Sequence, residues 1–209
     1  MNRLQTIVEA DEDFARKWMR NNLLPADVVT ERGQKNLSGA IRWFTRNGGE
    51  DRSWGNHSGI IGVTANYIQA LSRVVECPVL DWRFSGELEI HRYVPLDSIT
   101  RVRVAQAAEG YIGRRYGTFK IGAHAIDGFL GKVLRRDVYL ARRFCLMERY
   151  PICSWIVSWA YKRIPYAFLG KDPRAVTPDD IHDDVTRSED WVRVVKRFLG
   201  GRFDLARPF

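Results

Sequence analysis

The chain has 209 residues, 45% of them hydrophobic and 12% aromatic, and carries a formal net charge of +8. This length and composition suit one globular domain over residues 1–209 that buries a substantial core. The sequence lacks apolar stretches of the ~20 residues that a bilayer span needs and the apolar core of a signal peptide, so we expect a soluble, cytoplasmic protein.

The first part of the chain mixes helical and extended patterns. Residues 1–20 are predicted to be helical, because apolar residues recur there at helical spacing. Residues 24–30 indicate a turn into a short strand. Residues 36–45 indicate a short helix or strand before a Gly-rich loop.

Three strand patterns follow, at residues 57–63, 73–79 and 86–94. Their short spacing and turn residues predict an antiparallel sheet. Beyond them the chain becomes helical, starting at Asp97 or Ser98, either of which can cap a helix.

This layout predicts an α+β fold, with strands mostly in the first half and helices after them. We expect an N-terminal helical extension over residues 1–23, a core over residues 24–192 and a C-terminal tail over residues 193–209.

The positive charge is concentrated in residues 101–149, which contain 11 Lys or Arg against 4 Asp or Glu, and which include a predicted basic helix over residues 129–144. The arginine pairs of this segment are Arg114/Arg115, Arg135/Arg136 and Arg142/Arg143. Such a segment can bind an anionic surface or a phosphate-bearing substrate, although a solvated helix face has the same composition. Aromatic residues are not interleaved as a single-strand binding groove requires, so we do not expect nucleic acid as a partner.

The three cysteines, Cys77, Cys145 and Cys153, have spacings typical of neither a disulfide framework nor a zinc site, which favours free thiols. Cys153 lies in YPICSWIVSWAY (150–161), a run apolar nearly all round that predicts a buried helix. Because Pro151 is tolerated in a first turn, Cys153 is predicted to lie there too. The N–H groups and dipole at a helix N-terminus favour thiolate over thiol, so the sequence predicts a prepared nucleophile.

A thiolate nucleophile needs an imidazole within hydrogen-bond reach, and the chain has four histidines. His57 opens a predicted strand, and its small neighbours leave the ring accessible. His91 is predicted to lie on a solvent-lined strand, His124 in a basic helical or loop region, and His182 in an exposed acidic segment. We therefore favour His57, although lone histidines and buried cysteines are more often structural than catalytic.

Other chemistries have weaker support. A zinc site built from Cys145, Cys153, His124 and His182 would lack the short ligand spacings of structural zinc. The chain has no GxxxxGK[ST] or GxGxxG phosphate loop and no GxSxG elbow. We therefore predict neither a metal nor a cofactor.

Five short motifs occur in an order that is typical of one family. They are NHSGIIG (56–62), RVVEC (73–77), IGRRYG (112–117), ICSWIVSWAY (152–161) and VTPDDI (176–181). With histidine before cysteine, the chain resembles the circularly permuted branch of the NlpC-like papain-fold hydrolases. That branch contains the YiiX-like proteins and, more distantly, the lecithin:retinol acyltransferase group.

The resemblance implies a papain-like fold with Cys153 as nucleophile, His57 as base and Glu76 as the group that orients the histidine. A carboxylate in the strand VVEC needs a partner if it is buried, while an exposed edge-strand position for Glu76 is an equal alternative. Two positions depart from the family pattern. Trp155 stands where the family often has glutamate, which we expect to reshape the pocket wall. Ala26 stands where the family has glycine, which we interpret as turn chemistry.

Two functions of different classes follow. The first is a thiol hydrolase that cleaves an amide or ester bond in a peptide, cell-wall peptide or acyl lipid, with the Cys153 backbone N–H stabilising the oxyanion. The second is a non-catalytic protein of the same fold, virus- or phage-associated or bound to membrane surfaces, that binds anionic surfaces through its arginine pairs. A lipid acyltransferase is a third alternative.

Overall fold

The computed structural model describes residues 7–33, 54–79, 86–117, 151–197 and 202–206, and six helical residues between 126 and 134. The segment predicted over residues 36–45, most of the predicted basic helix, His124, Cys145, Arg135/Arg136 and Arg142/Arg143 lie outside these ranges. In the part of the chain that is described, no helix has both the length and the apolar character needed to cross a membrane.

One eight-stranded antiparallel sheet forms the centre of the fold, with the strand order β1-β8-β7-β6-β2-β3-β4-β5. The strands are β1 (Ile7–Ala10), β2 (Val28–Arg32), β3 (His57–Ile61), β4 (Tyr67–Ala70), β5 (Val74–Cys77), β6 (Glu87–Tyr93), β7 (Trp191–Arg197) and β8 (Phe203–Ala206). The two ends of the described chain pair with each other, since β1 lies beside β8.

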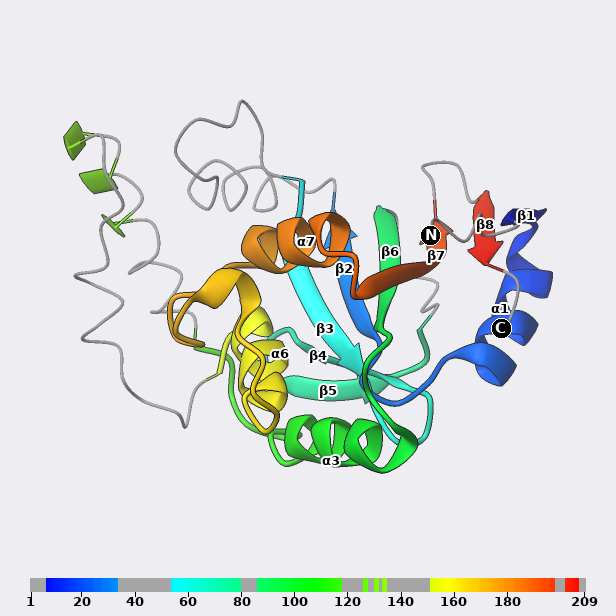
Figure 1. Ribbon diagram of the computed structural model, residues 1–209, viewed down its shortest axis with the longest axis horizontal. Helices are drawn as coiled ribbons and strands as arrows, with labels where there is room; N and C mark the ends of the chain where they lie inside the picture. The colour runs from blue at the N-terminus through cyan, green and yellow to red at the C-terminus, as the bar shows by residue number, and fades with distance from the viewer. Residues whose placement is uncertain are drawn as a thin grey trace.

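Helices cover both faces of this sheet (Figure 1). They are α1 (Glu12–Asn22), α3 (Ser98–Glu109), α6 (Cys153–Tyr161) and α7 (Pro178–Arg187), with a short 3-10 turn η1 (Phe168–Gly170) before α7. Alternation along the strands divides the core into two layers. Ile60 and Ile68 pack with α3, α6 and α7, whereas Ile61 and Tyr67 pack with α1 on the other face.

The helix starts follow from local sequence, with one exception. Asp11 caps α1 and Asp97 caps α3, each accepting a backbone N–H with its carboxylate. Thr177 and Asp180 form a reciprocal capping box at α7. Helix α6 instead starts after Ile152, whose side chain makes no capping hydrogen bond.

Buried charges and a hydroxyl fix the start of β2. Asp27 is fully buried and accepts two hydrogen bonds from the Arg92 guanidinium, at 2.9 and 2.7 Å. The Tyr161 hydroxyl at the end of α6 donates to the Ala26 carbonyl at 2.6 Å. Ala26 has φ 68°, a left-handed conformation that suits glycine better, so the departure at this position does concern turn geometry.

The predicted α+β fold with an antiparallel sheet is confirmed, but several element assignments are corrected. Residues 7–10 form β1 and are not helical. The predicted tail contains β8 and most of β7, whose buried residues continue the core. Strand β4 was not predicted, and its omission affects the site.

Candidate active site

Cys153 is the first residue of α6, and its side chain is buried against β3. Pro151 precedes the N-cap and does not lie in the first turn, but the predicted place of Cys153 in that turn is correct. Burial opposes a charged thiolate, yet the charge of His57, a hydrogen bond to it and the Ser58 and Ser154 N–H groups together lower the pKa of Cys153. The thiol therefore has the environment of a nucleophile.

His57, the first residue of β3, is brought to Cys153 as predicted. Burial alone would lower the pKa of this imidazole. The Cys153 charge and hydrogen bond, the Glu31 charge and a hydrogen bond to Gln69 outweigh burial and raise the pKa to about 9. The pair thus favours thiolate and imidazolium at the same pH.

Gln69 holds the far side of the imidazole. The His57 Nε2 lies 3.2 Å from the Gln69 Oε1, which accepts its hydrogen bond and leaves Nδ1 for the sulfur. The other end of the same amide donates to the Cys77 Sγ at 3.1 Å, which orients the Gln69 oxygen toward the histidine. Gln69 lies on β4, diagonally across from His57.

Glu31 places a buried carboxyl group beside His57. It is the cross-strand partner of His57 on β2, and only 7% of its surface is exposed. Burial raises the pKa of the Glu31 carboxyl, although the charge of His57 and the Tyr67 hydroxyl act against the rise. The sheet therefore presents Glu31, His57 and Gln69 side by side on three adjacent strands.

Tyr116 approaches the thiol from the segment that follows α3. Burial and the charge of Cys153 raise the pKa of its phenol, which hydrogen-bonds both the Cys153 side chain and the Cys153 backbone N–H. The segment is held in place where the Gly117 N–H donates to the Pro151 carbonyl at 3.0 Å. A hydroxyl beside the first N–H of α6 is placed where an oxyanion would form.

Helix α7 fixes the chain just before His57. The Asp179 Oδ1 accepts the backbone N–H groups of Trp54 at 2.8 Å and Gly55 at 3.2 Å. The Trp54 indole also stacks on His182, with ring centroids 4.0 Å apart. These contacts position the first residue of β3 against α6.

Glu76 is not brought to His57. It is exposed on β5 opposite Ile68, and its carboxylate accepts a hydrogen bond from the Thr64 hydroxyl. The orienting contact expected of Glu76 is made by Gln69. The unrecognised strand β4 explains the difference, because it lies between β3 and β5 in the sheet.

Two of the other histidines lie beside one buried carboxylate, away from the thiol. His91 is 2% exposed and not solvent-lined, and the Nε2 atoms of His91 and His182 lie 3.6 and 3.5 Å from the buried Glu89 carboxylate. His182 is also largely buried, on α7. Trp155 is 2% exposed and packs edge-on against Trp159, so it fills the core and does not form an open pocket wall.

Sequence reasoning missed three residues of this site. Tyr116 was in a quoted motif but had no assigned role. Gln69 and Glu31 carried no signal of their own, because each depends on which strands lie beside β3.

Comparison with known proteins identifies the fold. No family model and no curated protein matches the chain. Among solved structures, the chain is similar to the crystal structure of the metalloprotein yiiX from Escherichia coli O157:H7, with a TM-score of 0.56 and 16% identity over 85% of this chain and 99% of that chain. The expected resemblance to the YiiX-like proteins is confirmed at the level of the fold.

The similar protein is described as a metalloprotein. Within the described ranges of this chain, no group of three or more His, Cys, Asp or Glu side chains is arranged to hold a metal ion. Glu89 with His91 and His182 comes nearest in composition, but Lys196 and Arg193 already approach that carboxylate at 2.9 and 3.6 Å. These residues do not fit a metal site.

Proposed function

We propose that the protein is a papain-like cysteine hydrolase that cleaves an amide or ester bond, with Cys153 as nucleophile, His57 as acid and base, and Gln69 as the group that orients the histidine. The observation that carries this proposal is the buried thiol–imidazole pair. Its partners shift each other's pKa toward the charged forms even though burial acts against both.

In the first half of the reaction, the Cys153 thiolate attacks the carbonyl carbon, and the carbonyl electron pair moves to its oxygen. The Cys153 N–H and the Tyr116 hydroxyl would stabilise that oxyanion. When the tetrahedral intermediate collapses, the bond to nitrogen or oxygen breaks and His57 donates its proton to the leaving group. An acyl thioester on Cys153 remains.

In the second half, neutral His57 takes a proton from a water molecule that attacks the thioester. Collapse releases the carboxylic acid and restores the thiolate and the imidazolium. An amine or alcohol in place of water would make the same site an acyltransferase, so product analysis separates the two activities.

Differential alkylation tests the proposal. With iodoacetamide at neutral pH, Cys153 should react at least ~10-fold faster than Cys77, because its thiolate fraction is larger. The rates are read from the two peptides by mass spectrometry, so Cys77 is an internal control.

His57→Ala should slow the Cys153 reaction and leave the Cys77 rate unchanged. Cys153→Ala should reduce hydrolysis of an activated acyl ester by ~10³-fold or more. A Cys153 rate that is indifferent to His57→Ala would refute the proposed pair.

A further inference from the structure

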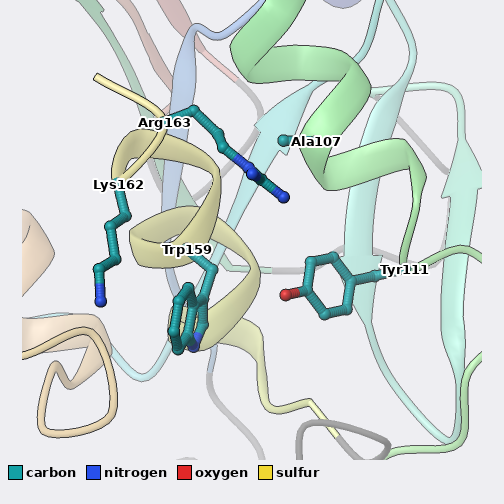
Figure 2. A pocket seen from close by; sticks show the side chains of 5 residues that line it. All are labelled: Ala107, Tyr111, Trp159, Lys162 and Arg163. Atoms are coloured by element: carbon teal, nitrogen blue, oxygen red, sulfur yellow. The ribbon is translucent and has the colours of Figure 1, made fainter.

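A second concave site lies near the other end of α6. It is a cavity of about 270 Å³ between the C-terminal ends of α3 and α6, lined by Ala107, Tyr111, Trp159, Lys162 and Arg163 (Figure 2). At a rise of ~1.5 Å per residue, Trp159 lies ~9 Å along the helix from Cys153, and its side chain points from a different face of α6. The cavity is therefore separate from the thiol site.

Aromatic rings form two walls of this cavity. Tyr111 follows α3, and its hydroxyl points toward the Trp159 indole of α6 in Figure 2. The guanidinium of Arg114 stacks on Tyr111, 4.5 Å from the ring centroid. Ring faces of this kind bind flat or apolar groups with little loss of side-chain entropy.

Two exposed cations stand at the rim. The Lys162 Nζ lies 4.5 Å from the centroid of the Trp159 ring, and the Arg163 side chain extends toward Ala107 on α3. Within the described part of the chain, neither cation has a salt-bridge partner. Asp172, the carboxylate whose pKa Lys162 helps to lower, is already bound by Arg174 at 3.1 Å. Their charge is available to a ligand.

The electrostatic balance at the rim favours an anion. The C-terminus of α6 contributes roughly half a negative charge, which full charges on Lys162 and Arg163 outweigh. Arginine presents a planar fork of N–H donors that matches carboxylate and phosphate oxygens, and lysine adds a point charge. A cavity of about 270 Å³ suits a small molecule or a head group.

We propose that this cavity binds an organic anion. Its carboxylate or phosphate lies between Lys162 and Arg163, and its apolar or planar body lies on Trp159 and Tyr111. The site does not involve Cys153, so this binding proposal can be tested independently of the hydrolase proposal.

Calorimetric titration of the 209-residue chain with phenyl phosphate tests this site. Binding should be saturable and tighter than that of inorganic phosphate or of phenol, each of which offers half of the contacts. The double variant Lys162→Gln/Arg163→Gln should weaken binding about tenfold or more, and Trp159→Leu should also weaken it. Cys153→Ala should leave it unchanged.

Arg103→Gln is the matched control, because it removes an exposed cation on α3 that does not line the cavity. It should leave binding within about twofold of the wild type. Circular dichroism spectra and melting temperatures verify that each variant is folded.

Vesicles of phosphatidylcholine with and without phosphatidic acid separate a lipid head group from a free ligand. Retention that requires phosphatidic acid and is lost in the double variant assigns the site to a head group. Binding of phenyl phosphate alone assigns it to a soluble anion. If neither binds, or if the double variant binds as the wild type does, the proposal is wrong.

Discussion

The Cys153 thiol and the His57 imidazole each determine the charge of the other. Burial disfavours the charged form of both groups, and each group favours the charged form of the other. Glu31 and Gln69 add a charge and an acceptor on the far side of the ring, which favour the imidazolium. The protonation of His57 thus depends on four side chains that come from four different helices and strands.

The His57 titration should therefore have a midpoint near pH 9, compared with an ordinary value of 6.5. Because the folded-state pKa is raised, the stabilisation from this proton is complete below pH 6.5 and is lost as pH rises through about 9. Glu31→Gln should move the midpoint to lower pH, since it removes one of the charges that favour the imidazolium. Imidazole proton NMR measures both midpoints. A wild-type midpoint at or below 6.5 would contradict the charged pair.

Gln69 and Glu76 provide a matched pair of variants on adjacent strands. Gln69→Leu should reduce hydrolysis by roughly 10²-fold, because His57 loses the acceptor that fixes its orientation. Glu76→Gln should leave the rate within about twofold, because the Glu76 carboxylate is exposed and bonded to Thr64. The measurement is kcat/KM on an activated ester, with melting temperatures as the folding control. The opposite ranking would restore Glu76 as the orienting group.

Local signals were enough to predict that Cys153 and His57 lie together. The apolar run after Pro151 defines a buried helix start, and the small residues after His57 define a strand that can approach it. The third group could not be predicted in this way, because it depends on strand register. Strand β4 has only four residues, and recognising it would have placed Gln69 diagonally across from His57.

Helix α7 contributes to the site through its contacts with the backbone of residues 54 and 55. The Asp179 side chain accepts the N–H groups of Trp54 and Gly55, so the helix holds the chain that leads into β3. The sequence VTPDDI was recognised as a motif, but neither the Thr177 capping box nor a role for Asp179 was predicted from it. The contact of Asp179 with a segment more than a hundred residues away depends on the fold and has no local signal.

Asp179→Ala should lower the free energy of unfolding by about 1–3 kcal/mol, because it leaves buried N–H groups without their acceptor. It should also slow alkylation of Cys153, since His57 is then held less firmly. Asp11→Ala is the comparison. It removes the cap of α1 and should lower the free energy of unfolding by about 1 kcal/mol, but Asp11 does not contact the site. Denaturant unfolding and the alkylation rate are measured for both. Equal effects on alkylation would mean that Asp179 acts only on stability.

The sheet joins the two ends of the described chain. Strands β7 and β8 extend it beyond β6, and β1 pairs with β8, so segments expected to be an extension and a tail are integral to the fold. Alternating apolar residues in β7 and β8 were present in the sequence. Assigning them to a sheet required knowledge of where they pair, and their partners lie at the opposite end of the chain or in β6.

Phe203 tests how much the C-terminal strand contributes to the whole molecule. Its side chain is fully buried in the layer beneath α1, so Phe203→Ala should lower the free energy of unfolding by about 3–5 kcal/mol. Asp204→Asn, on the same strand but half-exposed, should change it by no more than about 0.5 kcal/mol. At temperatures where both variants are folded, the alkylation rate of Cys153 should equal that of the wild type, because β8 lies three strands away from β2 in the sheet order. If Phe203→Ala and the wild type unfold with the same denaturant midpoint, the C-terminal segment is a dispensable tail.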